Sequence, residues 1–137
     1  LEAGEDPKFI ARRMVIFASE DIGLAGNGGL NLAVSAFAAV ERIGMPESQI
    51  ILAHVVCALA KSKKDRSSYD ALLRAKKAAH ESMHLPVPLE IRNAPTKLMA
   101  DLGFGKGYKW ESGYHQPTSY LPKELGSQKF YFSEDPA

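Results

Sequence analysis

The sequence contains a single cysteine, Cys57, among its 137 residues. One cysteine excludes an internal disulfide, and its place inside an apolar stretch fits a reducing compartment, so we expect a cytoplasmic protein. Long apolar runs are also missing. The longest, Ile50 to Ala60, has about 11 residues and includes His54, which is too short to cross a membrane. No signal-peptide pattern is present.

A strong excess of either charge is absent as well. The 17 basic and 16 acidic side chains leave a net charge of +1, so any nucleic-acid contact requires a local patch. A hydrophobic content of 45% and a charged content of 24% are typical of a folded globular chain. Because the first residue is Leu1 and not methionine, we expect this sequence to belong to a longer protein.

Capping residues and apolar spacing predict four main helices and a short fifth one. An Asp-Pro pair, two glycine stops and several prolines mark their ends. The expected bounds are Pro7 to before Gly23, Leu30 to Gly44, Pro46 to Ala60, a cap at Asp65, Ser67 or Ser68 to before Pro86, and Asn93 to Leu102.

The fold class that follows is all-α, a bundle of four main helices with a short helix and an irregular C-terminal tail. The third helix is apolar nearly all round, so we expect it to be buried in the middle of the bundle. We divide the chain into a helical assembly domain, residues 1–103, and a glycine- and aromatic-rich tail, residues 104–137, packed on it. The tail holds at most a short strand near 129–132.

The string from His80 to His84 matches the H-E-x-x-H pattern of zinc proteases. On a helix this spacing places two imidazoles one turn apart, with Glu81 beside a zinc-bound water. The candidate third ligands are Glu90, Asp101, Glu111 and His115. None of these carries a partner motif, so a solvated helix end is the interpretation we favour. A small zinc-dependent hydrolase that uses His80, Glu81 and His84 is the alternative.

The glycine-rich segment from Leu102 to Gly107 resembles a phosphate loop only in part. Such a loop is G-x-x-x-x-G-K-[ST] and leads into a helix whose N–H groups surround the phosphates. Here Lys106 is followed by Gly107 and Tyr108, which favours simple glycine turns. We therefore predict that the 137-residue chain contains no catalytic residue, binds no cofactor and has no ATPase activity.

Charges on the first helix indicate a candidate subunit interface. Glu20 and Asp21 lie at its C-terminal end, where the helix dipole disfavours negative charge. Arg12 and Arg13 are two turns upstream, too far for an i,i+4 pair. A neighbouring element or another subunit would then neutralise the acidic pair, unless all four residues form a solvated face.

Two patches suit phosphates and stacked bases, and they make a DNA-binding module a further alternative. They are Lys61, Lys63 and Lys64 in the basic connector, and Lys106, Lys109 and Trp110 in the tail, together with Arg66 and Tyr108 beside them. A solvated connector and aromatic rings that clamp the tail are the competing interpretations.

Three segments of the chain resemble the replication-associated recombination protein A (MgsA-type) family of AAA+ ATPases, which is related to the Werner-helicase-interacting proteins. They are 5–25 with EDP and FASEDIGLA, 39–47 with AVERIGMPE, and 92–109 with RNAPTKLM and GYK. Tyr120-Leu121-Pro122 follows in family order. Between Trp110 and Tyr120 the chain departs from the family pattern, which leaves the role of residues 111–120 open.

The resemblance implies the region after the ATPase core, a helical collar that assembles subunits like those of clamp loaders. It implies a homotetramer, and a nucleoid-associated parent protein that uses ATP and magnesium at stalled replication forks. That parent would bind DNA and replication proteins such as single-strand-binding protein. We place the subunit contact around 87–91 with Arg92 and Asn93, and take the charged residues of the first helix as a second candidate.

Overall fold

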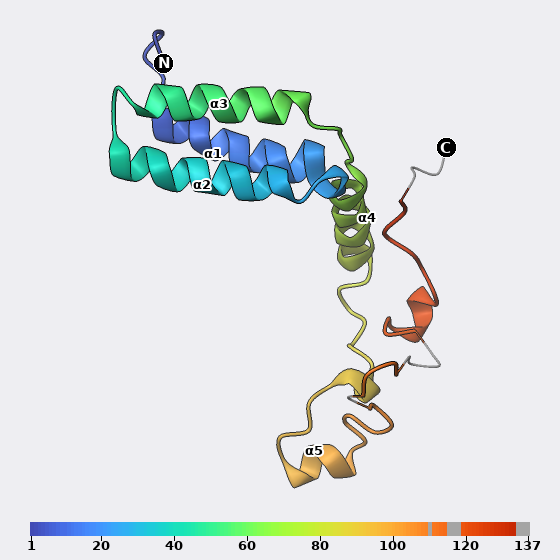
Figure 1. Ribbon diagram of the computed structural model, residues 1–137. Helices are drawn as coiled ribbons and strands as arrows, with labels where there is room; N and C mark the ends of the chain where they lie inside the picture. The colour runs from blue at the N-terminus through green and yellow to red at the C-terminus, as the bar shows by residue number, and fades with distance from the viewer. Residues whose placement is uncertain (110, 115–118, 134–137) are drawn as a thin grey trace. The chain divides into compact units, whose positions relative to one another are not determined.

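The computed structural model describes residues 1–109, 111–114 and 119–133. Every regular element in these residues is a helix or a helical turn, which confirms the all-helical class (Figure 1). The main helices are α1 (Pro7–Phe17), α2 (Gly28–Ile43), α3 (Ser48–Lys61), α4 (Ser67–Glu81) and α5 (Lys97–Asp101). Shorter helical turns are Ala18–Ile22, Gly23–Ala25, Leu89–Ile91 and Lys123–Leu125.

The chain forms two compact units. Residues 1–75 and 131–133 belong to the first unit, and residues 76–130 form the second. Helix α4 begins in the first unit and ends in the second. Our functional division at residue 103 stays a prediction. Within the described residues, no helix combines the length and apolar character needed to cross a membrane.

Helix α1 begins as its sequence predicts. The carboxylate of Asp6 accepts hydrogen bonds from the N–H groups of Lys8 (3.2 Å) and Phe9 (3.1 Å), and Pro7 occupies the first turn. The helix continues into a π-helical turn, Ala18–Ile22, and ends at Gly23, whose φ is +48°. The local signals therefore define both ends of this helical segment.

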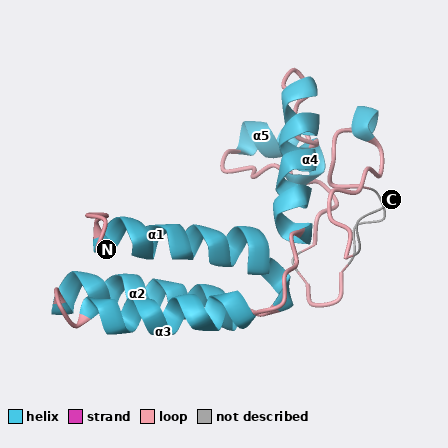
Figure 2. Cartoon of the chain, turned by 90° about the horizontal axis from the view of Figure 1, so that it is seen from above, coloured by secondary structure: helices cyan, strands magenta, loops and turns pink. Residues whose placement is uncertain are grey.

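Helices α1, α2 and α3 pack side by side in the first unit (Figure 1, Figure 2). Their core combines four small side chains, Ala11, Ala18, Ala33 and Ala36, with larger ones such as Ile22, Leu52 and Leu59. Small residues let helix axes approach closely. Gly29 of α2 also lies at a close contact, because a Cβ there would be 3.2 Å from Ile22 Cδ1 and 3.7 Å from Leu59 Cδ2.

The expectation that the third helix is buried all round is wrong. Only one face of α3 is covered, with Ser48, Leu52, Val55 and Leu59 buried. The hydroxyl of Ser48 donates to Gly44 O at 2.6 Å, which satisfies this buried polar group. The opposite face of α3 is exposed because α1 and α2 both pack on the same side of it.

The expectation that the fourth helix completes a shell around the third also fails in the single chain. Helix α4 packs along none of α1, α2 and α3. Its predicted apolar face includes Leu72 and Leu73, which are exposed, and Met83, which lies beyond the helix end at Glu81. The helices that pack on one another in the first unit are therefore α1, α2 and α3.

The second unit has little core of its own. Ala78 is its one buried residue among those that the structure describes. Local hydrogen bonds hold the unit instead: Thr96 Oγ1 accepts from Met99 N at 3.3 Å and caps α5, and Gly105 N donates to Leu89 O at 2.8 Å. The second of these bonds ties the turn after α5 to the proline-rich segment before it.

Candidate assembly and nucleic-acid surfaces

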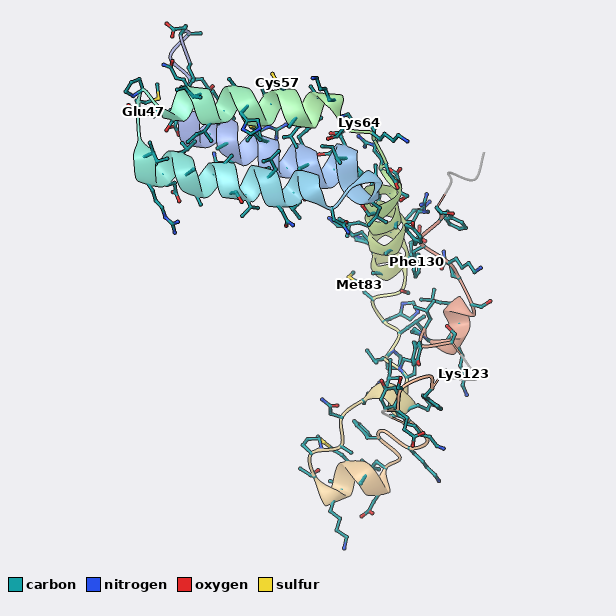
Figure 3. All side chains as sticks on the ribbon, in the orientation of Figure 1. Glu47, Cys57, Lys64, Met83, Lys123 and Phe130 are labelled. Atoms are coloured by element: carbon teal, nitrogen blue, oxygen red, sulfur yellow. The ribbon has the colours of Figure 1, made fainter. Side chains whose placement is uncertain are left out.

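The uncovered side of α3 is an apolar surface. Ile50 is 72% exposed and Val56 48% exposed, and Ala53 and Cys57 are exposed as well, with the polar His54 exposed among them. Figure 3 shows Cys57 on the side of α3 away from α1 and α2. We call Ile50, Ala53, Val56 and Cys57 the α3 face. Contiguous exposed apolar surface of this kind marks sites of association.

Helix α4 presents a second apolar surface. Leu72 and Leu73 are exposed, although the apolar pattern of this helix predicts that both are buried. The sequence predicted that these residues share one apolar face, and that this face packs against the bundle. Their exposure adds to the apolar surface that the first unit leaves uncovered.

The acidic pair at the end of the first helical segment finds its partner in the same chain. Arg66 Nη1 lies 3.2 Å from Asp21 Oδ1 and 3.8 Å from Glu20 Oε1. The N–H of Asp65 also donates to Asp21 O at 2.9 Å. The sequence left open whether a neighbouring element or another subunit neutralises the acidic pair. Arg66 of the neighbouring connector supplies the positive charge, so these contacts need no second subunit.

The two arginines of α1 lie apart from this pair. Arg12 and Arg13 are both exposed, and the Arg12 guanidinium is 5.4 Å from the centre of the Phe9 ring. Their assignment to an interface stays a prediction, as does that of Glu20 and Asp21.

One lysine of the basic connector has a structural role. Lys64 Nζ donates to Leu59 O at 3.0 Å and lies 4.5 Å from the centre of the Phe17 ring. It therefore satisfies a carbonyl of the last turn of α3, where positive charge is favoured. Lys61 and Lys63 are exposed. The DNA contact predicted for all three stays a prediction.

Asp65 supports the start of α4. Its Oδ1 accepts a hydrogen bond from Ser67 N at 2.9 Å. The neighbouring Ser67, through its side chain and then its backbone N–H, lowers the pKa of Asp65. The charged carboxylate is thus the form that the helix start favours.

Arg92 organises the second unit. Its Nε donates to Val87 O at 2.6 Å, and its guanidinium lies 5.4 Å from the centre of the Phe104 ring. Arg92 is half-buried, whereas Asn93 beside it is exposed. An intrachain role thus accounts for Arg92, and the interface role predicted for both residues stays a prediction.

The glycine-rich segment after α5 is a series of turns. Gly103, Gly105 and Gly107 have φ values of +87°, +70° and +86°. A Cβ on Gly105 would lie 3.3 Å from Arg92 O, so this glycine allows a close backbone approach. Lys106 is exposed, and the backbone that follows Gly107 is irregular through Lys109, unlike the helix that a phosphate loop requires.

The tail brings Tyr108, which belongs to the predicted tail patch, together with Tyr120, which the sequence did not assign to a DNA contact. Tyr108 and Tyr120 both line two hollows of about 320 and 490 Å³. Lys109 lines the smaller one, whereas Trp110, also of the predicted tail patch, lies outside the described residues. The aromatic and glycine-rich composition of the tail was the available signal, but the spacing of these tyrosines is not periodic.

The H-E-x-x-H string lacks the helix that its interpretation needs. Helix α4 ends at Glu81, so His84 lies beyond it in a turn. Among the described residues, no group of three or more histidine, cysteine or acidic side chains is placed to hold a metal ion. His115, one of the candidate third ligands, lies outside those residues.

A family model described as "MgsA AAA+ ATPase C terminal" matches residues 1–137. The chain belongs to this family. The match extends over the bundle, over α4 and over the second unit, so both units are parts of one MgsA C-terminal region. This result confirms the resemblance found in the sequence.

Curated relatives of this MgsA C-terminal region agree with the assignment. It is 39% identical over 136 residues to "Replication-associated recombination protein A" of Coxiella burnetii. That alignment covers 96% of this chain and 31% of the relative. It is 38% identical to "ATPase WRNIP1" of Dictyostelium discoideum, with 96% and 15% covered. The Escherichia coli replication-associated recombination protein A is 34% identical, with 96% and 30% covered. The chain thus spans a third or less of each relative's length.

Proposed function

We propose that this chain is the C-terminal assembly module of an AAA+ ATPase that acts in replication-coupled recombination and repair at stalled forks. The module itself binds no nucleotide and catalyses no reaction, and the ATP and magnesium sites belong to the rest of the protein. The family membership and the relatives' names support this assignment. The module holds subunits together as a homotetramer.

The observation that carries the assembly role is the exposed α3 face. Ile50 of this face is 72% exposed, and α3 has no lysine, arginine, aspartate or glutamate before Lys61 at its end. An uncharged apolar helix face is costly to leave in water, at about 25 cal/mol for each Å². A second copy of the chain removes that cost, and closed symmetric assemblies use the same face on every subunit.

The test is the native mass of the chain by sedimentation, with a matched pair of variants. Ile50→Asp places a carboxylate on the α3 face and should shift the mass to that of the monomer. Ser35→Asp adds the same charge at an exposed position of α2 and should leave the assembly intact. A wild-type chain that is monomeric at high micromolar concentration contradicts the assembly role.

Cys57 gives an independent measure of whether the α3 face is covered. It is exposed in the single chain and is the sole cysteine of the sequence, so a bulky maleimide reports on this face alone. Labelling should be slow in the wild-type chain and fast in Ile50→Asp. If the chain is oligomeric but Cys57 reacts equally fast in both proteins, the subunits meet elsewhere.

The alternative interface at Arg92 and Asn93 can be tested in the same way. Arg92→Glu removes the hydrogen bond to Val87 O as well as any intersubunit contact, so its effect on mass alone is ambiguous. Asn93→Asp alters an exposed side chain and leaves that bond in place. Loss of assembly in Asn93→Asp, with Ile50→Asp still oligomeric, would place the contact in the second unit.

A further inference from the structure

Two tyrosines of the second unit, Tyr108 and Tyr120, are shared by the linings of two hollows. The hollow of about 320 Å³ also includes Lys109, Glu111 and Tyr114. The hollow of about 490 Å³ also includes Glu90, Arg92 and Asn93, so each lining holds one basic and one acidic side chain. Tyr108 is 39% exposed and Tyr120 49% exposed, so both rings reach the surface.

The ring of Tyr108 is held in a defined orientation. Tyr114 packs against it edge to face, with ring centres 6.3 Å apart and planes at 80°. The hydroxyl of Tyr114 donates to Gly107 O at 3.1 Å, which anchors this supporting ring to the backbone beside Tyr108. A fixed ring loses little conformational entropy when a planar ligand stacks on it.

Charge is divided unevenly between the two units. Residues 76–130 contain eight lysines and arginines against five aspartates and glutamates, a net +3, although the whole chain has a net charge of +1. Lys106 and Lys109 flank Tyr108 in the sequence and are exposed. An anionic ligand with flat apolar groups complements this combination.

We propose that Tyr108 and Tyr120 form a stacking platform for bases of single-stranded nucleic acid, with Lys106 and Lys109 on its phosphates. Bases occupy the hollows on either side of the tyrosines, and the Asn93 amide and Arg92 guanidinium lie at the edge of the larger one. Every base has a π-face, so the site accepts different sequences. A duplex keeps its bases stacked on each other and fits this platform poorly.

The experiment measures binding of a fluorescent oligothymidylate to the full chain by anisotropy at several salt concentrations. The wild-type chain should bind the single strand more tightly than a duplex of the same length. Tyr108→Ala with Tyr120→Ala should weaken binding about tenfold or more, because each stacked base contributes on the order of 1–3 kcal/mol. Tyr131→Ala changes an exposed tyrosine of the first unit and should leave binding unchanged.

A second pair of variants keeps the test decisive if the double variant folds poorly. Tyr120→Phe preserves the aromatic face and should retain binding, whereas Tyr120→Leu preserves apolar bulk without the face and should lose it. Lys106→Gln with Lys109→Gln should reduce the salt dependence, by a slope of about 0.7 for each lost phosphate contact. Native mass is measured on every variant, so failure of this site is separable from failure of assembly.

Three outcomes overturn the proposal. One is the absence of single-strand binding by the wild-type chain at high micromolar concentration. Another is equal retention of binding by Tyr120→Leu and Tyr120→Phe. The third is duplex binding as tight as that of the single strand, which would assign the lysines to general phosphate contact.

Discussion

At the scale of single residues, the contact between the end of the first helical segment and the α3–α4 connector depends on one glycine. Gly23 has a φ of +48°, and a Cβ there would clash with Asp65 O and lie 3.2 Å from Ser68 Oγ. The same connector supplies Asp65 N and Arg66 to Asp21. The absence of a side chain at Gly23 thus lets the connector approach the helix end closely.

Gly23→Ala should therefore lower the free energy of unfolding by about 2 kcal/mol or more, from backbone strain and the clash with Asp65 together. Gly26→Ala is the matched control, because Gly26 has an extended backbone and open space around its Cβ position. Urea unfolding of both variants measures the difference. Equal stability of the two variants would show that the connector does not pack closely on Gly23.

Asp65 gives the first unit a defined pH dependence. Its pKa in the folded chain is lowered by the Ser67 side chain and backbone N–H. The contribution to stability is therefore fully present above the unfolded-state pKa of about 4 and is lost as the pH falls through the folded value. Asp65→Asn should be less stable than wild type at pH 7, and this difference should shrink in acid.

Unfolding in urea at neutral and acidic pH measures this difference. Ser67→Ala removes the leading cause of the lowered pKa and should reduce the same pH dependence. A stability difference between wild type and Asp65→Asn that is constant across the acid range would contradict the assignment.

At the scale of elements, α3 combines two faces of opposite character. Leu59 is 1% exposed in the core, next to Gly29 and Ile22, whereas the α3 face is uncovered. The hydrophobic run 50–60 therefore stabilises the bundle through one face and, as we propose, mediates association through the other. Uniform apolar composition does not by itself distinguish them.

Leu59→Ala should lower the free energy of unfolding by about 2–5 kcal/mol, because it leaves a cavity in the core. Leu24→Ala makes the same chemical change at a residue that is 52% exposed and should shift stability by about 0.5 kcal/mol or less. Calorimetry or urea unfolding of the two variants measures both changes in the free energy of unfolding. Similar losses for both would mean that the core does not lie along Leu59.

At the scale of the whole molecule, the two units differ in how they are held together. The first unit has a buried core, and the second relies on hydrogen bonds and ring contacts around Arg92. The glycine-rich turn 26–29 leads into α2 but lacks the Gly-Lys-Ser/Thr sequence of a phosphate loop. Within the described residues, no group of side chains is placed to hold a metal ion.

The purified chain should accordingly show no ATP turnover above a buffer blank, with or without magnesium, because no element provides a phosphate cradle. Elemental analysis should find no stoichiometric zinc, and Glu81→Gln should change neither the metal content nor any property of the chain. Tightly bound zinc lost together with a hydrolytic activity in Glu81→Gln would establish the alternative enzyme.

Local signals in the sequence determined much of this protein. The Asp6 cap, the stop at Gly44 and the start near Ser67 depend on residues a few positions apart, so these helix ends and the all-helical class could be predicted. The end of α4 at Glu81 and the start of α5 at Lys97 differ from the predicted bounds, before Pro86 and at Asn93. The family could be recognised from the same segments.

Only the tertiary structure decided which faces are covered. An apolar helix such as α3 reads the same whether its own chain or another copy covers it, and its exposed face depends on where α1 and α2 pack. The pairing of Arg66 with Asp21 spans 45 residues, and the two hollows at Tyr108 and Tyr120 join segments with no shared periodicity. Such contacts depend on the path of the backbone between distant residues, which local propensity does not specify.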